Sequence, residues 1–402
     1  MIKLKILHIS TSDSGGAGVA TLRLNKALRK VGVDSQMLVK EKYTNDRFVH
    51  VYSPPLKPRY FKAWDHIKYR FRKFFELRSN INPINHEYYS SYVTNYDLVE
   101  NQLVRNADII HLHWVADFLD YKSFFRKVNK PIFWTFHDLN PILGGFHYEG
   151  ELDKLSINQL TIEKGIAKIK LNCIKANNNL SFVAISKWMQ SRLESEFPNH
   201  NIYYSPNSID SDEYYPLSKV FCRQVFGIKN DLIVILFSCH SLKVERKGFH
   251  LVLEIIKYYR NRSDILFLSV GQPSDRIEDL SNYHSLGKIN DNRLLNIVYN
   301  LADLLLIPSL EDNLPNTIVE SIMTGTPVIG SNVGGIPDII QEYENGLLVN
   351  EATSIAFTKA IDKFLSNRNV FDSNEIRKRA QISYDLIRQG ERMNNIYKNA
   401  IQ

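Results

Sequence analysis

Asp312 and Glu320, two carboxylates in the second half of the chain, are separated by seven residues. The intervening pattern predicts a polar loop that runs into a short helix, so that both carboxylates would face one ligand. The backbone N–H groups of Asn316 and Thr317 would lie in the first helical turn, where the helix dipole and unsatisfied donors suit a phosphate. The spacing from Thr317 to Glu320 is also that of a capping box, and the spacing alone favours this cap.

Arg246 and Lys247 form a pair of cations between a strand-like run and a helical stretch. Such a pair suits a diphosphate, because Arg offers a planar fork of donors and Lys a mobile point charge. The alternative is a solvated surface turn, which is the commoner setting for two adjacent cations.

His137 and Asp138 end an apolar strand-like run in the first half of the chain. His137 would either hydrogen-bond a sugar hydroxyl or be satisfied by its neighbour Asp138, and its position alone favours neither role. His111 and His113 form a His-x-His pair without an accompanying cluster of Cys, Asp or Glu. We therefore expect no metal site.

Gly15 and Gly16 follow the first strand-like run, where glycines let an anionic ligand approach a helix N-terminus. A dinucleotide-binding fingerprint would need a third glycine where this chain has Thr21. The glycines therefore indicate a phosphate or close packing, and nothing more specific.

Strands must position these residues, and β-branched apolar runs alternate with helical stretches along the whole chain. This alternation predicts parallel sheets built from βαβ units. The strands expected in the first half are Lys5–Ser10, Val33–Val39, Phe48–Tyr52, Asp108–Trp114, Ile132–His137, Phe182–Ile185 and Ile202–Ser205. Those expected in the second half are Leu232–Ser238, Ile265–Val270, His284–Leu286, Leu304–Pro308, Val328–Ser331 and Leu347–Val349.

The polar stretch 206–216, bracketed by prolines, is expected to link two α/β blocks. The expected domains span 1–206 and 217–383, and a helix within 384–402 is expected to pack back on the first domain. The predicted fold class is α/β, with two doubly wound, Rossmann-like domains that face each other across a cleft. A ligand would lie in this cleft, at the carboxyl ends of the strands.

The composition excludes several classes of protein. The 402 residues are 44% hydrophobic, 23% charged and 11% aromatic, which excludes collagen-like and wholly disordered chains. Three cysteines without ligand spacing favour a reducing compartment over a disulfide framework. Two lysines interrupt the apolar N-terminus, which favours a first strand over a signal peptide. We therefore expect a cytoplasmic protein.

The net charge of +7 is concentrated between residues 57 and 78, a segment that contains eight Lys or Arg residues and two acidic residues. Trp64, Ile67, Phe71 and Phe74 recur there at helical spacing, so that one face would be apolar and the rest basic. This pattern is typical of a helix on an anionic membrane surface, and a core-facing helix is the nearly equal alternative. One short basic segment without a recognition motif does not support nucleic-acid binding.

Taken together, these segments resemble the glycosyltransferase family 4 of GT-B-fold enzymes, and in particular bacterial exopolysaccharide and colanic-acid-type transferases. The resemblance covers residues 6–350. Its motifs, in the order of the family, are Gly15-Gly16, Thr-Phe-His137-Asp, Asn207-Ser-Ile-Asp, Arg246-Lys247-Gly, Glu311-Asp-Asn-Leu-Pro-Asn-Thr-Ile-Val-Glu320, Gly334-Gly335-Ile-Pro-Asp and Asn345-Gly346-Leu-Leu-Val.

The resemblance implies retaining transfer of a sugar from a UDP- or GDP-linked donor, with no required metal and no cofactor. In the second domain, which would bind the nucleotide sugar, Glu320 would contact the ribose and Asp312 the donor-sugar hydroxyls. Asn316 and Thr317 would offer N–H groups to the diphosphate. Lys247 would neutralise the diphosphate as it leaves.

The first domain would bind the acceptor in such an enzyme. His137 would hold the donor sugar near the reacting carbon, and Gly15 and Gly16 would admit the donor phosphate and the acceptor. The further substrate-binding residues expected are Asp138, Arg246, Glu311 and Asn313.

The sequence departs from the family pattern at three places. Asp312 stands where the family usually has Glu, with Glu311 as the alternative contributor. The usual Arg before the motif Lys is missing, and Arg246 or Lys243 would take its place. Related sequences often carry a cysteine cluster after the Gly-Gly-x-His-Tyr segment, and this chain has none there.

The leading hypothesis is a glycosyltransferase of cell-surface polysaccharide synthesis that acts on a lipid-linked saccharide acceptor at the inner face of the cell membrane. One alternative is a sugar-nucleotide epimerase on a similar scaffold, for which the sequence offers no assignable acid/base set. Another is a noncatalytic nucleotide-sugar-binding or scaffold protein, which the missing Arg before the motif Lys permits.

Overall fold

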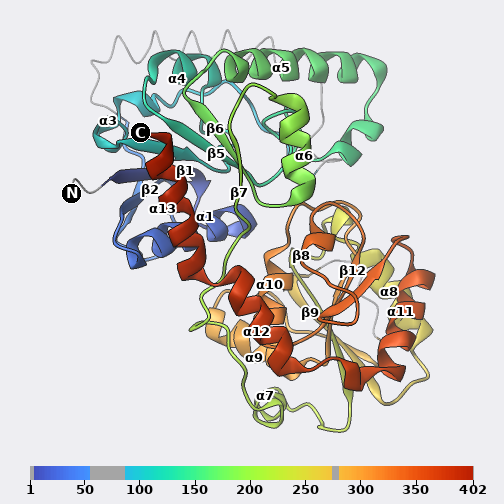
Figure 1. Ribbon diagram of the computed structural model, residues 1–402. Coiled ribbons are helices and arrows are strands. Elements are labelled where there is room, and N and C mark those ends of the chain that lie inside the picture. The colour runs from blue at the N-terminus through green and yellow to red at the C-terminus, as the bar shows by residue number, and fades with distance from the viewer. Residues whose placement is uncertain (1–3, 55–86, 274–279, 402) are drawn as a thin grey trace. The chain divides into compact units, whose positions relative to one another are not determined.

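The computed structural model describes residues 4–54, 87–273 and 280–401, and these form two compact units (Figure 1). Unit 1 comprises Met1–Ser205 and Gly390–Gln402, and unit 2 comprises Pro206–Gln389. The basic segment 57–78 lies outside the described residues. Among the described residues, no helix combines the length and the apolar character needed to span a bilayer.

Unit 1 is built on a parallel sheet of seven strands in the order β3-β2-β1-β4-β5-β6-β7. The strands are β1 (Lys5–Ser12), β2 (Asp34–Glu41), β3 (Val49–Val51), β4 (Ile109–Leu112), β5 (Ile132–Phe136), β6 (Leu180–Ala184) and β7 (Ile202–Tyr204). The direction of winding reverses between β1 and β4. In a doubly wound sheet, ligands bind beyond the strand carboxyl ends at this reversal.

Helices cover both faces of this sheet. Leu24 and Leu28 of α1 (Gly15–Lys30) join Met393 and Tyr397 of α13 (Leu386–Ala400) in one buried cluster, and these two helices lie side by side in Figure 1. A second buried cluster contains residues of the other helices. These are α3 (Gln102–Asn106), α4 (Tyr121–Lys127), α5 (Ile157–Lys175) and α6 (Lys187–Glu196).

Unit 2 contains a parallel sheet of six strands in the order β10-β9-β8-β11-β12-β13. The strands are β8 (Ile233–Ser241), β9 (Ile265–Gln272), β10 (Tyr283–Ser285), β11 (Leu304–Ile307), β12 (Val328–Ser331) and β13 (Gly346–Val349). The winding reverses between β8 and β11, whose register pairs Leu305 with Leu236.

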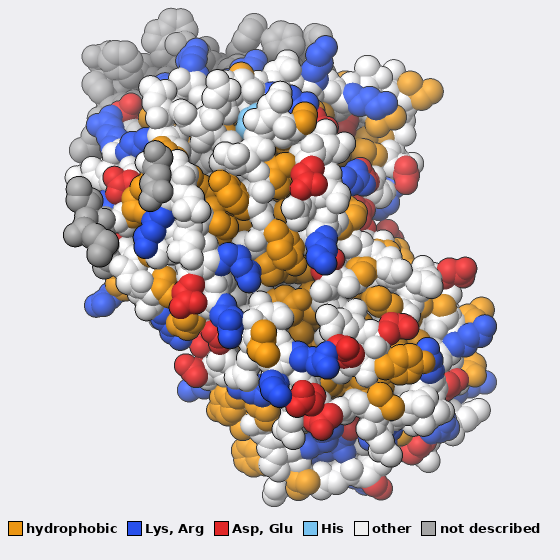
Figure 2. All heavy atoms as spheres, viewed as in Figure 1, with side chains coloured by type: hydrophobic (Ala, Val, Ile, Leu, Met, Phe, Trp, Pro, Cys, Tyr) orange, Lys and Arg blue, Asp and Glu red, His pale blue; other side chains and the backbone are white. Residues whose placement is uncertain are grey.

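The helices of unit 2 connect these strands. They are α7 (Lys219–Val225), α8 (Phe249–Tyr258), α9 (Asn292–Leu301), α10 (Asn316–Met323), α11 (Ser354–Ser366) and α12 (Ser373–Tyr384). Short 3₁₀ turns lie at Leu98–Glu100, Glu149–Lys154, Glu245–Lys247, Ile336–Asp338 and Arg368–Val370. On the face of unit 2 shown in Figure 2, acidic and basic side chains are interspersed.

Each of the thirteen expected strands is present, and the predicted α/β class with two parallel, doubly wound sheets is confirmed. The stretch 206–216, expected as a linker, is packed into unit 2. Ser208 Oγ donates to Gln389 Oε1 over 2.6 Å, and Ile209 forms a parallel bridge with Asp385. Main-chain pairing thus fixes this stretch to the segment that precedes α13.

Candidate active site

The expected cations and the first expected carboxylate of unit 2 lie at the reversal of its sheet. Arg246 and Lys247 belong to a 3₁₀ turn that follows β8, and Asp312 lies in the loop that follows β11. β8 and β11 are neighbouring parallel strands, so that their carboxyl ends meet at the same edge. The topology therefore places these residues where a doubly wound sheet binds its ligand.

Asp312 is buried and paired with both cations. Lys247 Nζ forms an ion pair with Asp312 Oδ2, and Arg246 Nη1 lies 3.8 Å from Oδ1. Burial alone would raise the pKa of Asp312, but the charges of Lys247 and Arg246 outweigh it and lower the pKa below its ordinary value. Asp312 is therefore ionised at neutral pH, and it holds the two cations in place.

Backbone contacts connect the loops around Asp312. Leu310 N donates to Arg246 O over 2.7 Å, and Gly335 N donates to Asn313 O over 2.7 Å. Gly334 has a φ of +55°, and a Cβ there would overlap the backbone oxygen of Asp312. Gly334, which follows β12, thus lets the backbone there lie close to the loop that contains Asp312, the carboxylate loop.

Glu320 is buried on α10, and its Oε2 accepts a hydrogen bond of 2.8 Å from the Tyr299 hydroxyl. The expected capping box is wrong, because α10 begins at Asn316 with Pro315 as its N-cap and has no side-chain cap. Thr317 is therefore the second residue of the helix. The Glu320 carboxylate is directed to Tyr299 on α9.

The first turn of α10 contains Asn316 and Thr317 and no acidic residue. Backbone N–H groups in a first turn point out of the helix end, where the positive end of the dipole lies. Asn316 Oδ1 accepts from Asn207 Nδ2 over 3.0 Å, so that the Asn-Ser-Ile-Asp segment fixes this helix start. Glu311 is half-buried, and its backbone oxygen accepts from Arg246 Nη1 over 3.2 Å.

In unit 1, Gly15 and Gly16 begin α1 directly after β1. Gly15 has a φ of +71°, a conformation that glycine adopts without strain. A Cβ added at either glycine would meet no described atom within 4 Å. Among the described residues, nothing obstructs the Cβ positions of these two glycines, and the first turn of α1 has no acid.

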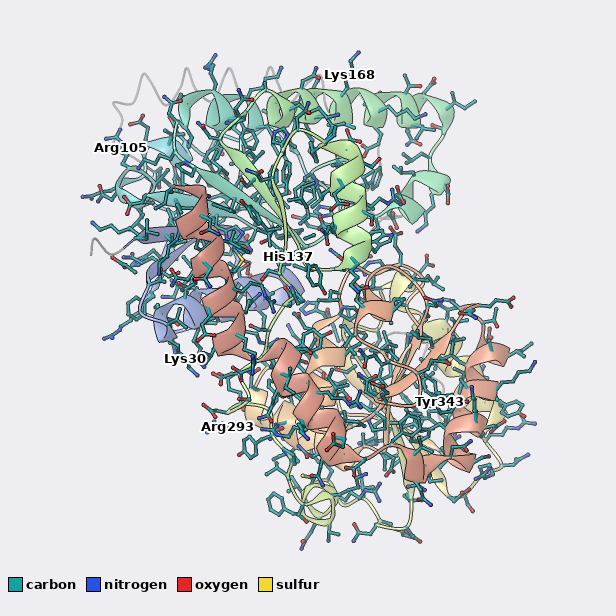
Figure 3. The ribbon with its side chains drawn as sticks, in the orientation of Figure 1. Lys30, Arg105, His137, Lys168, Arg293 and Tyr343 are labelled. Atoms are coloured by element: carbon teal, nitrogen blue, oxygen red, sulfur yellow. The ribbon has the colours of Figure 1, made fainter. Side chains whose placement is uncertain are left out.

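His137 lies where β5 ends, at the margin of unit 1 in Figure 3. Its Nε2 lies 3.1 Å from His113 Nδ1, and His113 Nε2 lies 2.9 Å from His8 Nδ1. Burial lowers the pKa of His137 to about 4, although the charge of Asp138 opposes this shift. Burial also lowers the pKa of His8 to about 3. These imidazoles are therefore neutral at physiological pH.

The ring nitrogens of His8, His111 and His113 lie within 4.8 Å of one another, a grouping able to hold a metal ion. Each of these nitrogens already has a hydrogen-bond partner, including Thr135 Oγ1 at 2.7 Å from His111 Nε2. A metal would displace several of these bonds in a fully buried site. The expectation that His111 and His113 bind no metal stays a prediction.

Asp138 is buried and pairs with His147, whose Nδ1 lies 2.6 Å from Asp138 Oδ2. The same oxygen accepts from Trp114 Nε1 over 2.9 Å, and Asp138 Oδ1 accepts from Asn140 N. Burial alone would raise the pKa of Asp138, but the interaction with His147 reverses this and lowers it. Asp138 thus holds the loop that follows β5.

Unit 2 brings its expected residues together at one sheet edge and the adjoining start of α10. In unit 1, Gly15 and Gly16 follow β1 and His137 follows β5, and β4 lies between these two parallel strands. Sequence reasoning missed His8, His147 and Tyr299. His8 carried one signal, because it is a lone imidazole within an apolar strand. His147 carried another signal, because it is the His of the Gly-Gly-x-His-Tyr segment. Tyr299 carried none, since its partner lies in another element.

Two family models match the chain. Residues 14–213 match the model described as Glycosyltransferase Family 4, and residues 233–367 match the one described as Glycosyl transferases group 1. An uncharacterized glycosyltransferase of Methanocaldococcus jannaschii is 26% identical over 194 residues, which are 46% of this chain and 49% of that protein. An uncharacterized 41.2 kDa protein in the cps region of Klebsiella pneumoniae is 25% identical over 255 residues, which are 60% of this chain and 65% of that protein. The chain thus matches about half to two thirds of the length of these relatives.

Among solved structures, Anabaena HepE in complex with UDP-glucose superimposes with a TM-score of 0.68. The match covers 98% of this chain and 100% of that chain at 14% identity, so that it shows the fold alone. The two doubly wound units thus form the GT-B architecture. With a family model matched in each half and this fold over the whole length, the chain belongs to the group 1, family 4 glycosyltransferases.

Proposed function

We propose that this nucleotide-sugar-dependent glycosyltransferase moves a hexose from a UDP- or GDP-linked donor to a lipid-linked saccharide, with retention of configuration and without a metal. The product would be a cell-surface polysaccharide. A cps-region relative in Klebsiella pneumoniae supports this pathway, and the UDP-glucose bound to Anabaena HepE supports the donor class.

One observation carries the donor site: Lys247 and Arg246 meet Asp312 at the reversal of the unit 2 sheet. A diphosphate that binds there would compete for Lys247, and Asp312 would then be released toward the sugar hydroxyls. The first turn of α10, with Asn316 and Thr317, would offer N–H groups to the phosphates. Arg246 would supply the charge of the Arg that the family pattern usually places earlier.

The nucleoside and the sugar would be held on either side of Lys247 and Arg246. Glu320, pre-oriented by Tyr299, would accept from the ribose hydroxyls. Glu311 and Asn313 would contribute further contacts to the donor. In unit 1, His137 would hold the donor sugar, while Gly15 and Gly16 at the start of α1 would admit phosphate and acceptor. Asp138 would act through the loop that it orders.

The reaction would then be a same-face substitution. The acceptor hydroxyl oxygen forms a bond to the anomeric carbon as the bond from that carbon to the diphosphate oxygen breaks. The leaving diphosphate takes the hydroxyl proton. Positioning and stabilisation of the leaving charge by Lys247 and Arg246 would be the main contributions of the protein.

The enzyme would work in the cytoplasm, peripherally on the inner face of the cell membrane. The support for this is the sequence of segment 57–78, whose basic and aromatic residues suit anionic lipid. A lipid-linked acceptor would be reached from that surface.

Titration of the purified chain with UDP, GDP and NAD, followed by calorimetry, tests the donor site. We expect UDP or GDP to bind, and Lys247→Met and Glu320→Gln to weaken binding at least about tenfold, the loss of one charge-assisted contact. Lys359→Met, at an exposed position on α11, is the control and should bind like the wild type. Binding of NAD alone would contradict the proposal.

Turnover tests the reaction, by release of UDP or GDP from nucleotide sugars in the presence of lipid extracts or saccharides. Acceptor-dependent release with an α-anomeric product from an α-linked donor is expected. Donor binding without release would indicate a noncatalytic binding protein. Interconversion of the donor sugar without an acceptor would indicate an epimerase.

A further inference from the structure

Three aromatic rings gather at the carboxyl edge of the unit 1 sheet. Trp114 follows β4, and His147 lies in the loop after β5. The segment that contains Tyr88 pairs with this loop through a bridge between Tyr89 and Phe146. The Tyr88 ring centroid lies 5.2 Å from that of Trp114 and 5.1 Å from that of His147. Tyr88 is 38% exposed and Trp114 is half-buried, so that these two residues, the aromatic platform, are accessible to a ligand.

Hydrogen bonds hold both rings of the aromatic platform in place. Trp114 Nε1 donates to Asp138 Oδ2 over 2.9 Å, and the Tyr88 hydroxyl donates to Asp117 Oδ2 over 3.1 Å. Burial and the charge of Asp117 raise the pKa of Tyr88, so that its hydroxyl stays a donor. A ligand would therefore meet rings that are already ordered, which reduces the entropy lost on binding.

Asp117 is the polar group beside the aromatic platform. Its φ of +51° is a left-handed conformation that is costly for residues other than glycine, although Asp and Asn tolerate it best. In this conformation its Oδ1 accepts from Ser91 N over 2.8 Å and its Oδ2 from Tyr88. A carboxylate can accept about four hydrogen bonds. Asp117 is half-buried, so that a hydroxyl of a ligand can reach a remaining lone pair.

The loop that contains Trp114 and Asp117 is fixed to the end of β1. Thr11 N donates to Trp114 O over 2.7 Å, and Thr11 Oγ1 donates to Ala116 O over 2.6 Å. Gly15 begins α1 shortly after Thr11. The aromatic platform thus lies at the reversal of the sheet between β1 and β4, where doubly wound sheets bind ligands.

The electrostatic environment of the aromatic platform is negative. The charges of Asp117 and, to a smaller extent, Glu41 both raise the pKa of Tyr88. Lys40 Nζ lies 3.7 Å from Glu41 Oε1 and offsets part of that charge. Among the described residues, no Lys or Arg forms an ion pair with Asp117. An anionic ligand would therefore be repelled here.

We infer that Tyr88, Trp114 and Asp117 form an acceptor subsite for an uncharged pyranose. The apolar C–H face of the sugar ring packs on the aromatic platform, and a sugar hydroxyl donates to Asp117. A sugar that carries a carboxylate or a phosphate is disfavoured. This inference rests on the proposed transfer to a saccharide, and it adds the class of sugar and the residues that select it.

Nitrogen-15 NMR of tryptophan-labelled protein tests the subsite, because the Trp114 indole N–H lies in the aromatic platform. The Trp114→Phe spectrum identifies its signal among those of the four tryptophans. The probes are the methyl glycosides of glucose, galactose, mannose and N-acetylglucosamine, with methyl glucuronide as the anionic probe. We expect at least one neutral glycoside to shift the Trp114 signal saturably, and the glucuronide to bind at least about fivefold more weakly. No shift with any neutral glycoside, or tighter binding of the glucuronide, overturns the inference.

Tyr88→Ala removes the exposed ring of the aromatic platform. We expect the neutral glycoside to bind about tenfold more weakly, while the affinity for UDP or GDP stays unchanged. Tyr215→Ala is the matched control, because Tyr215 is 43% exposed and lies in unit 2. Equal glycoside affinities of the two folded variants contradict the inference.

Asp117→Asn tests the selection by charge with little change of the backbone, because Asn also tolerates a positive φ. Its amide oxygen can accept from Ser91 N, and its amide nitrogen can donate to the Tyr88 hydroxyl. We expect the discrimination between the neutral glycoside and the glucuronide to fall at least about fivefold. A merely structural effect would weaken both probes alike and leave the discrimination unchanged, which would refute the role of Asp117.

Nucleotide binding separates a failure of this inference from a failure of the proposed function. If UDP or GDP binds and no glycoside shifts the Trp114 signal, the subsite is refuted and the proposed donor site stands. If a glycoside shifts the signal and neither nucleotide binds, the proposed function fails, and the sugar site loses its role as an acceptor subsite.

Discussion

Tyr299 donates its hydroxyl hydrogen to Glu320 Oε2 over 2.8 Å, and both side chains are buried. The tyrosine lies on α9 and the glutamate on α10, so that the bond joins two helices of unit 2. Burial and the charge of Glu320 raise the pKa of Tyr299 well above its ordinary value, which keeps the hydroxyl a donor. The carboxylate is thus oriented before any ligand binds.

Tyr299→Phe should leave Glu320 buried without this donor. A hydrogen bond to a charged group contributes about 1.5–3 kcal/mol, so that we expect UDP or GDP to bind at least about tenfold more weakly. Calorimetric titration measures this. Tyr258→Phe, at an exposed tyrosine on α8, is the control. Unchanged nucleotide affinity with a lowered melting temperature would assign Tyr299 a purely structural role.

Gly334→Ala should disturb the carboxylate loop, because the new Cβ would overlap the backbone oxygen of Asp312. Gly287→Ala has a similar φ of +68° but meets no described atom within 4 Å, so that it isolates the conformational cost of about 1–2 kcal/mol. We expect Gly334→Ala to lower the free energy of unfolding further and to abolish nucleotide binding. An equal loss in the free energy of unfolding for the two variants, measured in urea, would show that the carboxylate loop moves enough to relieve the overlap with the backbone oxygen of Asp312.

Lys170→Met should loosen the loop after β5. Lys170 is 1% exposed and donates to Gly144 O over 2.7 Å and to Asn140 O over 2.5 Å. Its removal leaves these oxygens buried without a donor, and we expect a loss of about 3 kcal/mol in the free energy of unfolding. Lys168→Met on the same helix, at the exposed side chain labelled in Figure 3, should change it by less than about 0.5 kcal/mol. Similar losses in both variants would contradict the structural role of Lys170.

The histidines of unit 1 predict a loss of stability in mild acid. Their ordinary pKa is 6.5, whereas burial lowers that of His8 to about 3 and that of His137 to about 4. Below pH 6.5 the unfolded chain therefore binds more protons than the folded one, and the free energy of unfolding falls as the pH falls. Each such histidine contributes a slope of about 1.4 kcal/mol per pH unit.

Urea unfolding above and below pH 6.5 measures this slope. His8→Gln should reduce the slope by about 1.4 kcal/mol per pH unit, which corresponds to one proton. The lowered pKa of Asp312 acts below its ordinary 3.8 and does not mask the effect. A flat profile down to pH 4 would show that the histidines are protonated in the folded protein.

Segment 57–78 predicts binding to anionic vesicles. Replacing Lys68, Arg70, Arg72 and Lys73 by Gln should abolish most of the sedimentation with phosphatidylserine vesicles. Each Lys or Arg near an anionic membrane surface contributes about 1 kcal/mol to the binding free energy. The matched control replaces four exposed lysines of unit 2, namely Lys229, Lys257, Lys359 and Lys378. Equal sedimentation of both variants would refute a dedicated membrane segment.

The strands could be predicted because buried parallel strands read as short apolar runs, and every run from Lys5–Ser10 to Leu347–Val349 is a strand of the structure. The strand ends were less certain, since His137 and Trp114 follow their strands. The end of a strand depends on where its neighbours stop pairing, which the sequence of one strand does not encode.

The unit 2 cation pair and Asp312 could be predicted because both follow strands that meet at one edge of the sheet. The partners Tyr299 and His8 could not be, because they depend on register and helix packing. The β1–β4 register sets His8 beside His111, 103 residues away in the sequence. The capping box was wrong because α10 begins at Asn316, with Pro315 as its N-cap, two residues earlier than the Thr-x-x-Glu spacing suggests.

The division of α13 between the units has a consequence for synthesis on the ribosome. Met393 and Tyr397 complete the unit 1 cluster around Ile6 and Leu28, but all of unit 2, Pro206–Gln389, is translated before them. At about 5–20 residues per second, this interval lasts about 10–40 s. During that time the nascent N-terminal sheet exposes the apolar surface that α13 will cover, which makes it prone to aggregate until residue 397 has left the ribosome.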